Sequence, residues 1–428
     1  MTLHQSSNDR RMRYIDRPWL LLDAEMSSTN LDPAMMEAVL QMQNQELAVR
    51  RVLKCEARPA LPKGENYLSL VSRITLEVVL GNGRKSYKNL ILKEVPPEEK
   101  NKEFVDNLGV FKIETEMYLR ILKQMEELMD EYHETEEMLW GRLIFYQPYT
   151  YLLFEDLKAT GFLMSPRQSC LDLEHGHLVL HSLGRFHGMS KILEERGIVN
   201  GKDFKPYAII TDKDLIKMFV HCGLRNLSEA MHQFWGSAWH RVADKLLMPL
   251  ETLQNKMLEI GKLDESRFNV VNHGDCWSNN MLFKYNWNHR PIAVRFLDFQ
   301  VSHYNSPCWD VTYFMFASIE PKIRREHYES LLRTYTNSLL LTLQKYHYSG
   351  SLPTHEEIAA EMERISFFRL TLVGVFHAVM TAEGTDALDM EKLLLSDGSI
   401  GFGKDLYSDM YKQRMGPELL KLEEQGHI

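Results

Sequence analysis

The sequence predicts an α+β protein with a small N-terminal part rich in antiparallel strands and a larger, mainly helical C-terminal part. Apolar residues alternate along residues 68–80, and a Gly-Asn-Gly turn separates them from a second alternating segment at 88–95, which is typical of a hairpin. A stripe of apolar residues at helical spacing follows over residues 104–129. After residue 157 the pattern is mainly helical, apart from a β-rich island at 268–299.

The first elements can be assigned in chain order. Residues 1–30 are polar and lack periodicity, so we expect a flexible arm. A helix is predicted from Pro33 to about Arg51, because Asp32 suits the N-cap and proline suits the first helical position. The hairpin described above follows, and two prolines end its second strand since proline cannot donate a hydrogen bond to a neighbouring strand.

A boundary near residue 155 divides the chain most naturally. Short apolar runs at 143–146 and 151–154 predict a pair of strands that closes the first part. The predicted organisation is therefore a flexible arm at 1–30, a β-rich N-terminal part at 31–154 and a mainly helical C-terminal part at 155–428. A length of 428 residues allows two or three domains, or one two-lobed enzyme.

Composition excludes several classes of function. The chain carries 50 basic and 59 acidic residues, a net charge of −9, which argues against nucleic acid as the main partner. Five scattered cysteines without a Cys-x-x-Cys pair favour a reducing, cytoplasmic setting. Residues 1–14 lack the apolar core of a secretory signal. The most apolar helical stretch, 367–380, contains Arg369 and His377, so we expect a buried helix and no membrane partner.

The strongest chemical signal is the segment His273-Gly274-Asp275-Cys276-Trp277-Ser278-Asn279-Asn280. Phosphoryl transfer requires a carboxylate beside the attacking hydroxyl and oxygen ligands for Mg²⁺. An Asp and an Asn five positions apart on one loop can supply both. We expect Asp275 to orient the hydroxyl or accept its proton, and Asn280 to hold the metal through its amide oxygen.

A second motif, Phe296-Leu297-Asp298-Phe299-Gln300, ends a predicted strand that begins near residue 292. An Asp at such a strand end can chelate the Mg²⁺ that bridges nucleotide phosphates. The two motifs lie at the two ends of one predicted hairpin, formed by residues 281–285 and 292–297. We therefore expect Asp275, Asn280 and Asp298 to lie close together. Each could by itself be an ordinary turn residue, but the ordered set with a hairpin between its members favours function.

These motifs resemble the catalytic loop and metal-binding motif of the aminoglycoside phosphotransferase and choline kinase group, which shares the protein-kinase-like fold. More specifically, the chain resembles the insect ecdysteroid kinase-like family, also called CHK kinase-like, with its His-Gly-Asp-x-Trp-x-Asn-Asn loop followed by Asp-Phe-Gln. The resemblance extends from about residue 40 to residue 415. It implies a two-lobed kinase-like fold and the use of ATP and Mg²⁺. Residues 31–154 would form a small antiparallel-sheet lobe that binds the nucleotide, and residues 155–428 a larger helical lobe for catalysis and substrate binding.

The resemblance also implies a nucleotide-binding lysine and glutamate. Lys93 lies late in the second hairpin strand, where the family's lysine contacts the nucleotide phosphates; the alternative is an ordinary solvated lysine. Glu114 is the only charged residue on an apolar stripe that includes Phe111 and Tyr118, so it faces inward and requires a partner. Glu116 falls on the outer side. The family's Phe-x-x-Glu-x-x-x-Tyr pattern agrees with the choice of Glu114.

Two further segments resemble nucleotide-contacting parts of the family. Gly64-Glu65-Asn66-Tyr67-Leu68-Ser69 resembles the loop that covers the phosphates, so Ser69 is expected to contact them, although one glycine before a strand is usually only a turn. Residues 151–157 resemble the hinge segment whose extended backbone offers hydrogen bonds to adenine. Phe154 and Glu155 are the residues predicted there.

Three residues near the motifs are interpreted as structural. Asp310 is expected to cap a helix or brace the catalytic loop, and His273 to brace the same loop through hydrogen bonds. Cys276 adjoins Asp275, but no activating base accompanies it, so a nucleophilic role is not expected.

Only a short segment separates Asp298 from the helix at Asp310, and no Ala-Pro-Glu anchor follows, which argues against a peptide substrate. The sequence therefore predicts an ATP- and Mg²⁺-dependent phosphotransferase with an alcohol group as acceptor, and an ecdysteroid or a lipophilic xenobiotic is the candidate substrate. Two alternatives stay open: a catalytically silent, ligand-binding pseudokinase on the same fold, and a choline- or aminoglycoside-type kinase.

Overall fold

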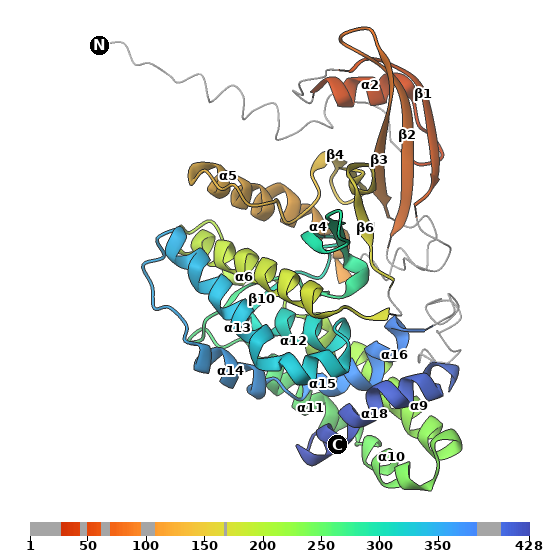
Figure 1. Cartoon of the computed structure of the whole chain (residues 1–428), viewed down its shortest axis with the longest axis vertical. Coiled ribbons are helices and arrows are strands. Elements are labelled where there is room, and N and C mark those ends of the chain that lie inside the picture. Colours follow the sequence, from red (N-terminus) through yellow and green to blue (C-terminus); the bar gives the residue numbers. More distant parts are fainter. Residues whose placement is uncertain (1–26, 43–48, 61–68, 96–107, 167–168, 383–403) are drawn as a thin grey trace. The chain divides into compact units, whose positions relative to one another are not determined.

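A computed structural model describes residues 27–42, 49–60, 69–95, 108–166, 169–382 and 404–428 (Figure 1). The chain forms two compact units that interleave in sequence. The first consists of the chain up to Thr115 together with Gly141–Thr160, and the second of Glu116–Trp140 and Gly161–Ile428. The predicted lobe limits, 31–154 and 155–428, stay a prediction. In the structure, residues 116–140 belong to the second unit although they precede part of the first unit in the sequence.

The first unit contains a five-stranded antiparallel sheet in the order β1-β2-β3-β5-β4. The predicted hairpin and the predicted strand pair are both confirmed. Alternation along β2 buries Ile74, Leu76, Val78 and Leu80 on one face. The bounds of the strands are β1 Val49–Pro59, β2 Leu70–Leu80, β3 Lys85–Glu94, β4 Leu143–Gln147 and β5 Tyr151–Glu155.

Helix α2 (Pro33–Met42) covers one face of this sheet, and its apolar residues share a core with the strands (Figure 1). Asp32 accepts hydrogen bonds from the backbone N–H groups of Ala34 and Met35, so the predicted cap is confirmed. The predicted continuation of the helix to Arg51 is wrong, because the chain enters β1 at Val49. Strand β1 lies at the edge of the sheet, and its irregular burial gives little alternation for a sequence pattern to detect.

The predicted helix at 104–129 is confirmed for its described part and extends slightly further. It consists of α4 (Val110–Glu116), a π-helical segment η2 (Met117–Leu122) and α5 (Lys123–Glu131). Residues 104–107 lie outside the described residues. A π-helical turn widens the helix and often occurs at functional sites, here directly after the segment that carries Glu114.

The second unit is built mainly from helices, and its two longest, α6 and α13, lie side by side (Figure 1). Its larger helices are α6 Leu173–Glu195, α9 Cys222–Ala230, α10 His240–Leu246, α11 Leu250–Gly261, α12 Cys308–Ala317, α13 Pro321–Lys345, α14 His355–Arg364 and α18 Asp409–Glu424. Its shorter helical segments are η5 Gly201–Asp203, α7 Ala208–Thr211, α8 Lys213–Leu215, η6 Ile216–His221, η7 Met231–Trp235, η8 Ser237–Trp239, α15 Phe368–Thr371, η10 Leu372–Phe376, α16 His377–Met380 and η12 Lys404–Tyr407. One further short segment, η3 Leu157–Thr160, ends the first unit.

The β-rich island of the second unit forms two small antiparallel sheets. Strand β7 (Val270–Asn272) pairs with β10 (His303–Asn305), and β8 (Met281–Tyr285) pairs with both β6 (Phe162–Met164) and β9 (Pro291–Phe296). The predicted α+β class, with an antiparallel sheet early in the chain and a larger, mainly helical remainder, is confirmed. Among the described helices, none has the length and apolar character needed to span a bilayer.

Candidate active site

The predicted catalytic loop, residues 273–280, connects β7 to β8 in the second unit. The loop turns sharply at Gly274, whose φ of +89° lies in the region that favours glycine. A Cβ atom there would lie 2.3 Å from the carbonyl oxygen of Val301, so no other residue fits without a shift of the backbone. A short 3₁₀ turn, η9 (Ser278–Asn280), leads from the loop into β8. The sequence therefore fixes the loop's path at its first turn.

Asp310 holds the base of this loop from helix α12. Its carboxylate accepts hydrogen bonds from the backbone N–H groups of His273 (2.6 Å) and Gly274 (2.8 Å) and from Nε2 of His187 (3.1 Å). Burial favours the neutral acid, but these donors and the nearby histidines prevail and lower the pKa of Asp310 to about 2. The predicted role as a loop brace is confirmed, whereas the alternative role as a helix cap is wrong, because Pro307 occupies the cap of α12.

His273 and Tyr207 fix the loop further. Nε2 of His273 lies 2.8 Å from the carbonyl oxygen of Leu297, and its Nδ1 accepts the backbone N–H of Asp275 at 3.2 Å. The hydroxyl of Tyr207 donates to the carbonyl oxygen of Gly274 at 2.7 Å, and its ring stacks on His303 at 4.2 Å. The bracing role predicted for His273 is confirmed. These contacts add to those that Asp310 makes with the backbone N–H groups of His273 and Gly274.

Asp275 stands at the tip of the loop, where both of its carboxylate oxygens accept a hydrogen bond. The hydroxyl of Tyr313 donates to Oδ1 at 2.7 Å, and the amide nitrogen of Asn280 donates to Oδ2 at 2.8 Å. Burial raises the pKa of Asp275; the Tyr313 hydrogen bond opposes this effect, and the negative charge of Asp298 adds to it. The result is a carboxylate that is fixed in orientation and holds a proton more readily than an ordinary Asp.

Asn280 and Asp298 meet at one end of the β8–β9 hairpin, as the motif spacing predicts. The backbone N–H of Leu297 donates to the carbonyl oxygen of Asn280 at 2.9 Å, which brings Asp298 beside the catalytic loop. The side-chain nitrogen of Asn280 donates to Asp275, so the planar amide turns Oδ1 in the opposite direction. Asp298 has a φ of +66°, a conformation that is uncommon outside glycine and asparagine.

The side-chain oxygens of Asn280 and Asp298 are suitable ligands for a Mg²⁺ ion that binds together with a nucleotide. Among the described residues, no group of three or more His, Cys, Asp or Glu side chains could hold a metal. Mg²⁺ binds oxygen ligands and is usually held by one or two carboxylates together with substrate phosphates and water. An amide oxygen from Asn280 and a carboxylate from Asp298 therefore suit a metal that arrives with a nucleotide, and do not suit a resident structural ion.

In the first unit, the predicted pairing of Lys93 with Glu114 is confirmed. Nζ of Lys93, on β3, lies 2.6 Å from Oε2 of Glu114, on α4. Both side chains are buried, with exposed fractions of 7% and 2%. Glu116, the competing candidate, is exposed. A buried charge pair in this geometry fixes the direction of the lysine side chain; whether Lys93 binds nucleotide phosphates stays a prediction.

The other predicted nucleotide contacts are placed only in part. Ser69 is buried just before β2, while the rest of its motif, residues 64–68, lies outside the described residues. Phe154 and Glu155 occupy the end of β5 and pair with β3, so the predicted extended linker does not begin before residue 156. The backbone N–H of Glu155 already donates to the carbonyl oxygen of Arg142 at 3.1 Å. Nucleotide contacts by these three residues stay predictions.

Tyr313 and Tyr207 are among the loop-contacting residues that sequence reasoning missed. Tyr313 follows Asp310 by three positions on α12, and this spacing places both side chains on the same face of a helix. This spacing could have predicted the contact of Tyr313 with the loop, because Asp310 was already expected to brace it. Tyr207 lies 67 residues before the loop, and no local pattern indicates its contact. Cys276 is buried, which raises the pKa of its thiol well above the usual range and agrees with a structural role.

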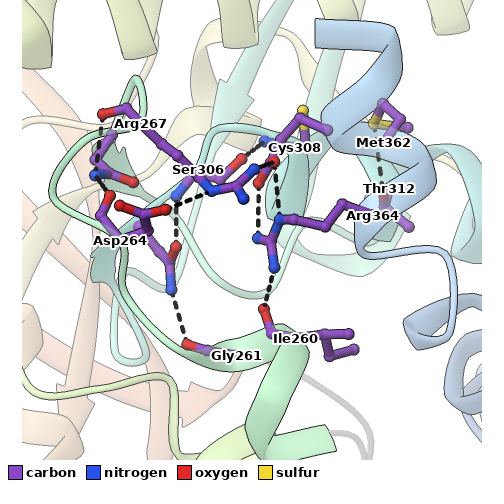
Figure 2. Close-up of polar contacts among 12 residues, drawn as sticks. Ile260, Gly261, Asp264, Arg267, Ser306, Cys308, Thr312, Met362 and Arg364 are labelled. Carbon is purple, nitrogen blue, oxygen red and sulfur yellow. Dashed lines mark hydrogen bonds and ion pairs between the residues drawn. The ribbon is translucent and has the colours of Figure 1, made fainter. Parts of the chain in front are cut away.

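A separate polar network supports the segment that leads into α12 (Figure 2). Arg364 of α14 donates to the carbonyl oxygen of Ile260 at 3.0 Å, and Asn305 donates to the carbonyl oxygen of Gly261 at 3.1 Å. The end of α11 is thereby tied to α14 and to the last residue of β10. Because β10 leads into α12, this network helps to position the helix that carries both the brace and the tyrosine.

Comparison with known proteins identifies one family. The family model described as "Ecdysteroid kinase-like family" matches residues 63–348. No curated protein matches the chain. The solved structure of the macrolide 2'-phosphotransferase from Brachybacterium faecium, an apoenzyme, is similar over 80% of this chain and 92% of that chain, at 11% identity and a TM-score of 0.33. The assignment to a family therefore depends on the sequence match and not on this distant likeness.

Proposed function

This chain belongs to the ecdysteroid kinase-like family, and we propose that it is a phosphotransferase that uses ATP and Mg²⁺ to phosphorylate an alcohol group on a small molecule. The observation that carries the proposal is the environment of Asp275. Its carboxylate is oriented by Tyr313 and Asn280, and burial raises its pKa. A general base works best when its pKa approaches the working pH, so this environment favours proton transfer.

In the proposed reaction, Asp275 orients the acceptor hydroxyl and takes up its proton as the oxygen attacks the γ-phosphorus of ATP. The new P–O bond forms as the bond to the leaving ADP oxygen breaks. Asn280 would serve two functions, since its amide nitrogen orients Asp275 while its amide oxygen, on the other side of the planar amide, is the proposed metal ligand. Holding the base in one orientation reduces the entropy that must be lost on reaching the transition state.

The nucleotide and the metal would be held by the remaining predicted residues. Bound Mg²⁺ neutralises charge on the nucleotide phosphates, and we propose Asn280 and Asp298 as its protein ligands. Lys93 would donate to the phosphates, with Glu114 fixing its direction. Ser69, Phe154 and Glu155 are proposed as further nucleotide contacts on the basis of the resemblance.

An apolar acceptor is the substrate class that the surroundings of Asp275 support best. The ring of Tyr313 lies 6.1 Å from the rings of Phe368 and Phe376. Phe376 is only partly buried, in contrast to most of the helical stretch around it. These aromatic rings give the surroundings of the proposed catalytic carboxylate an apolar character, which supports an ecdysteroid or another lipophilic alcohol as acceptor. The five free thiols support the proposal of a cytoplasmic location.

Transfer of labelled γ-phosphate from ATP to a panel of steroid and plant alcohols tests the proposal directly. The expected result is a phosphorylated product that requires Mg²⁺. Stabilisation by Mg²⁺-ATP without product from any alcohol would indicate the pseudokinase alternative. Product from choline or an aminoglycoside alone would assign the acceptor to the other alternative. Absence of both binding and turnover would overturn the proposal.

Lys93→Met tests the nucleotide part of the proposal. The variant should lose most of the rise in melting temperature that Mg²⁺-ATP produces, because methionine fills the space without the charge. Lys85→Met is a matched control on the same strand, since the Lys85 side chain is 70% exposed and pairs with Glu77. Equal responses of the two variants to the nucleotide would remove Lys93 from the binding site.

A further inference from the structure

A polar pocket lies in the helical unit, at the junction of α12, α13, α14, α15 and α18. It encloses about 110 Å³. Its charged lining residues are Arg324, Arg325, Glu363, Arg369, Glu418 and Lys421. None of them belongs to the catalytic loop, the metal-binding motif or the nucleotide-contacting segments. The pocket therefore requires an explanation of its own.

The lining has an excess of positive charge. Four basic side chains face two carboxylates, and one carboxylate, Glu418, is shared between Arg324 at 2.6 Å and Arg325. The other, Glu363, is 60% exposed, so water screens its charge. This local excess of cations stands out in a chain with a net charge of −9. A buried excess of charge is costly unless an oppositely charged group joins it.

Two of the cations are themselves buried and lie close together. The guanidinium groups of Arg324 and Arg369 lie 4.0 and 5.1 Å from the centroid of the Phe316 ring. Both residues are less than 5% exposed. Burial lowers the pKa of Arg324, and Glu418 opposes this effect. The two like charges are thus held on one aromatic ring with a single buried carboxylate among the lining residues.

Arg369 also has an unused donor. Its Nη2 donates to the carbonyl oxygen of Met362 at 3.0 Å and to Glu363 at 2.7 Å. Its Nε is buried and has no hydrogen-bond partner within the described chain. A buried guanidinium nitrogen without a partner is uncommon, because the lost hydrogen bond to water is not replaced. An acceptor in the pocket would satisfy it.

We propose that this pocket binds a small phosphate-type dianion, either free phosphate or the phosphate group of a larger metabolite. Guanidinium groups match phosphate oxygens in pairs, and Lys421 at the exposed end of the pocket adds a point charge. A volume of about 110 Å³ accommodates a phosphate group but is well below the roughly 300 Å³ or more of pockets that enclose a whole drug-sized ligand. The proposal is independent of the kinase activity.

Thermal unfolding with sodium phosphate tests this site, with sodium chloride used to hold the ionic strength constant. Phosphate should raise the melting temperature of the wild type in a saturable way, because it binds only the folded state. Lys421→Glu should weaken the apparent affinity for phosphate at least tenfold. Lys322→Glu, an equally exposed change on α13 that does not line the pocket, should leave it unchanged. Lys421 is exposed, so its substitution does not endanger folding.

Lys93→Met separates this site from the proposed nucleotide site, since phosphate should stabilise that variant as it does the wild type. Glycerol 3-phosphate distinguishes the two sources of the ligand: equal binding indicates the phosphate group of a larger molecule, and weaker binding than inorganic phosphate indicates the free ion. The proposal is wrong if phosphate gives no saturable stabilisation of the wild type. It is also wrong if Lys421→Glu and Lys322→Glu respond alike, or if Lys93→Met abolishes the effect.

Discussion

Two carboxylates lie in opposite electrostatic environments: one braces the base of the predicted catalytic loop from α12, and the other stands at the tip of that loop. At the base, Asp310 accepts two backbone N–H groups and a histidine, and its pKa falls to about 2. At the tip, Asp275 accepts hydrogen bonds from Tyr313 and Asn280, yet burial and the charge of Asp298 raise its pKa.

The difference separates a structural carboxylate, Asp310 of α12, from one proposed to take part in chemistry, Asp275 of the loop. An anion whose pKa is lowered is stabilised by the fold and stabilises the fold in return. An anion whose pKa is raised is held at a cost to folding, as is common for groups that take part in chemistry. We therefore expect substitutions at the base to affect stability and substitutions at the tip to affect turnover.

Asp275→Asn should have the largest effect. Removing a positioned general base typically lowers turnover by about 10²–10⁴-fold, and we expect about 10³-fold here. Affinity for nucleotide should change little, because the substitution leaves Lys93 intact. Steady-state kinetics with labelled ATP measures both quantities. Asp130→Asn, at an exposed position on α5, is the matched control and should retain full turnover.

Turnover by Asp275→Asn within twofold of the control would contradict the assignment of Asp275 as the general base. The contrast between a structural Asp310 and a catalytic Asp275 would then be lost.

Asp310→Asn should have the largest effect on stability. An amide offers one acceptor oxygen where three donors converge, so at least one buried donor loses its partner. Removing one member of a buried charged network typically costs about 3–5 kcal/mol, and we expect about 3 kcal/mol in the free energy of unfolding by urea denaturation. A loss below 0.5 kcal/mol, comparable to that of Asp130→Asn, would show that Asp310 does not brace the loop.

Acid titration should reveal the same carboxylate. The pKa of Asp310 is about 2 in the folded protein against an ordinary value of 3.8. A lowered pKa means that the stabilisation is complete above about pH 4 and is lost as the pH falls toward 2. The shift corresponds to about 2 kcal/mol. The difference in unfolding free energy between the wild type and Asp310→Asn should therefore shrink by about that amount over this range. A constant difference would exclude an ionised Asp310.

Tyr313→Phe should have the smallest effect. It removes one hydrogen bond from the Asp275 carboxylate, which typically costs about 1 kcal/mol or slightly more. Because this hydrogen bond lowers the pKa of Asp275, its loss should move the acidic limb of the pH–rate profile to higher pH. A purely structural tyrosine would leave that limb in place. Tyr87→Phe, at a residue that is 70% exposed, is the control.

Much of the site could be predicted from sequence because its parts are local. Asp275 and Asn280 lie on one loop, and the hairpin that follows brings Asp298 to them by its own hydrogen bonding. The pairing of Lys93 with Glu114 was predictable from a different signal, since a charged residue on an apolar helical stripe requires a buried partner.

The features that escaped prediction depend on packing between distant segments. Tyr207 contacts Gly274, which lies 67 positions later in the sequence. The residues around Tyr207 would look the same if it were an ordinary core tyrosine. Strand β1 escaped because an edge strand with irregular burial lacks alternation. The pocket around Arg324 and Arg369 collects residues from five helices, and no local sequence pattern indicates that they meet.

The stability of Asp275→Asn at pH 7 tests the contrast between base and tip most directly. Asparagine keeps the shape of the side chain, its oxygen can still accept from Asn280, and its amide nitrogen can donate to the Tyr313 hydroxyl, which then acts as acceptor. The substitution removes the negative charge and its repulsion from Asp298. The free energy of unfolding, measured by urea denaturation, should equal or exceed that of the wild type although turnover is lost. A loss as large as that of Asp310→Asn would contradict the account, because Asp275 would then be a structural carboxylate like Asp310.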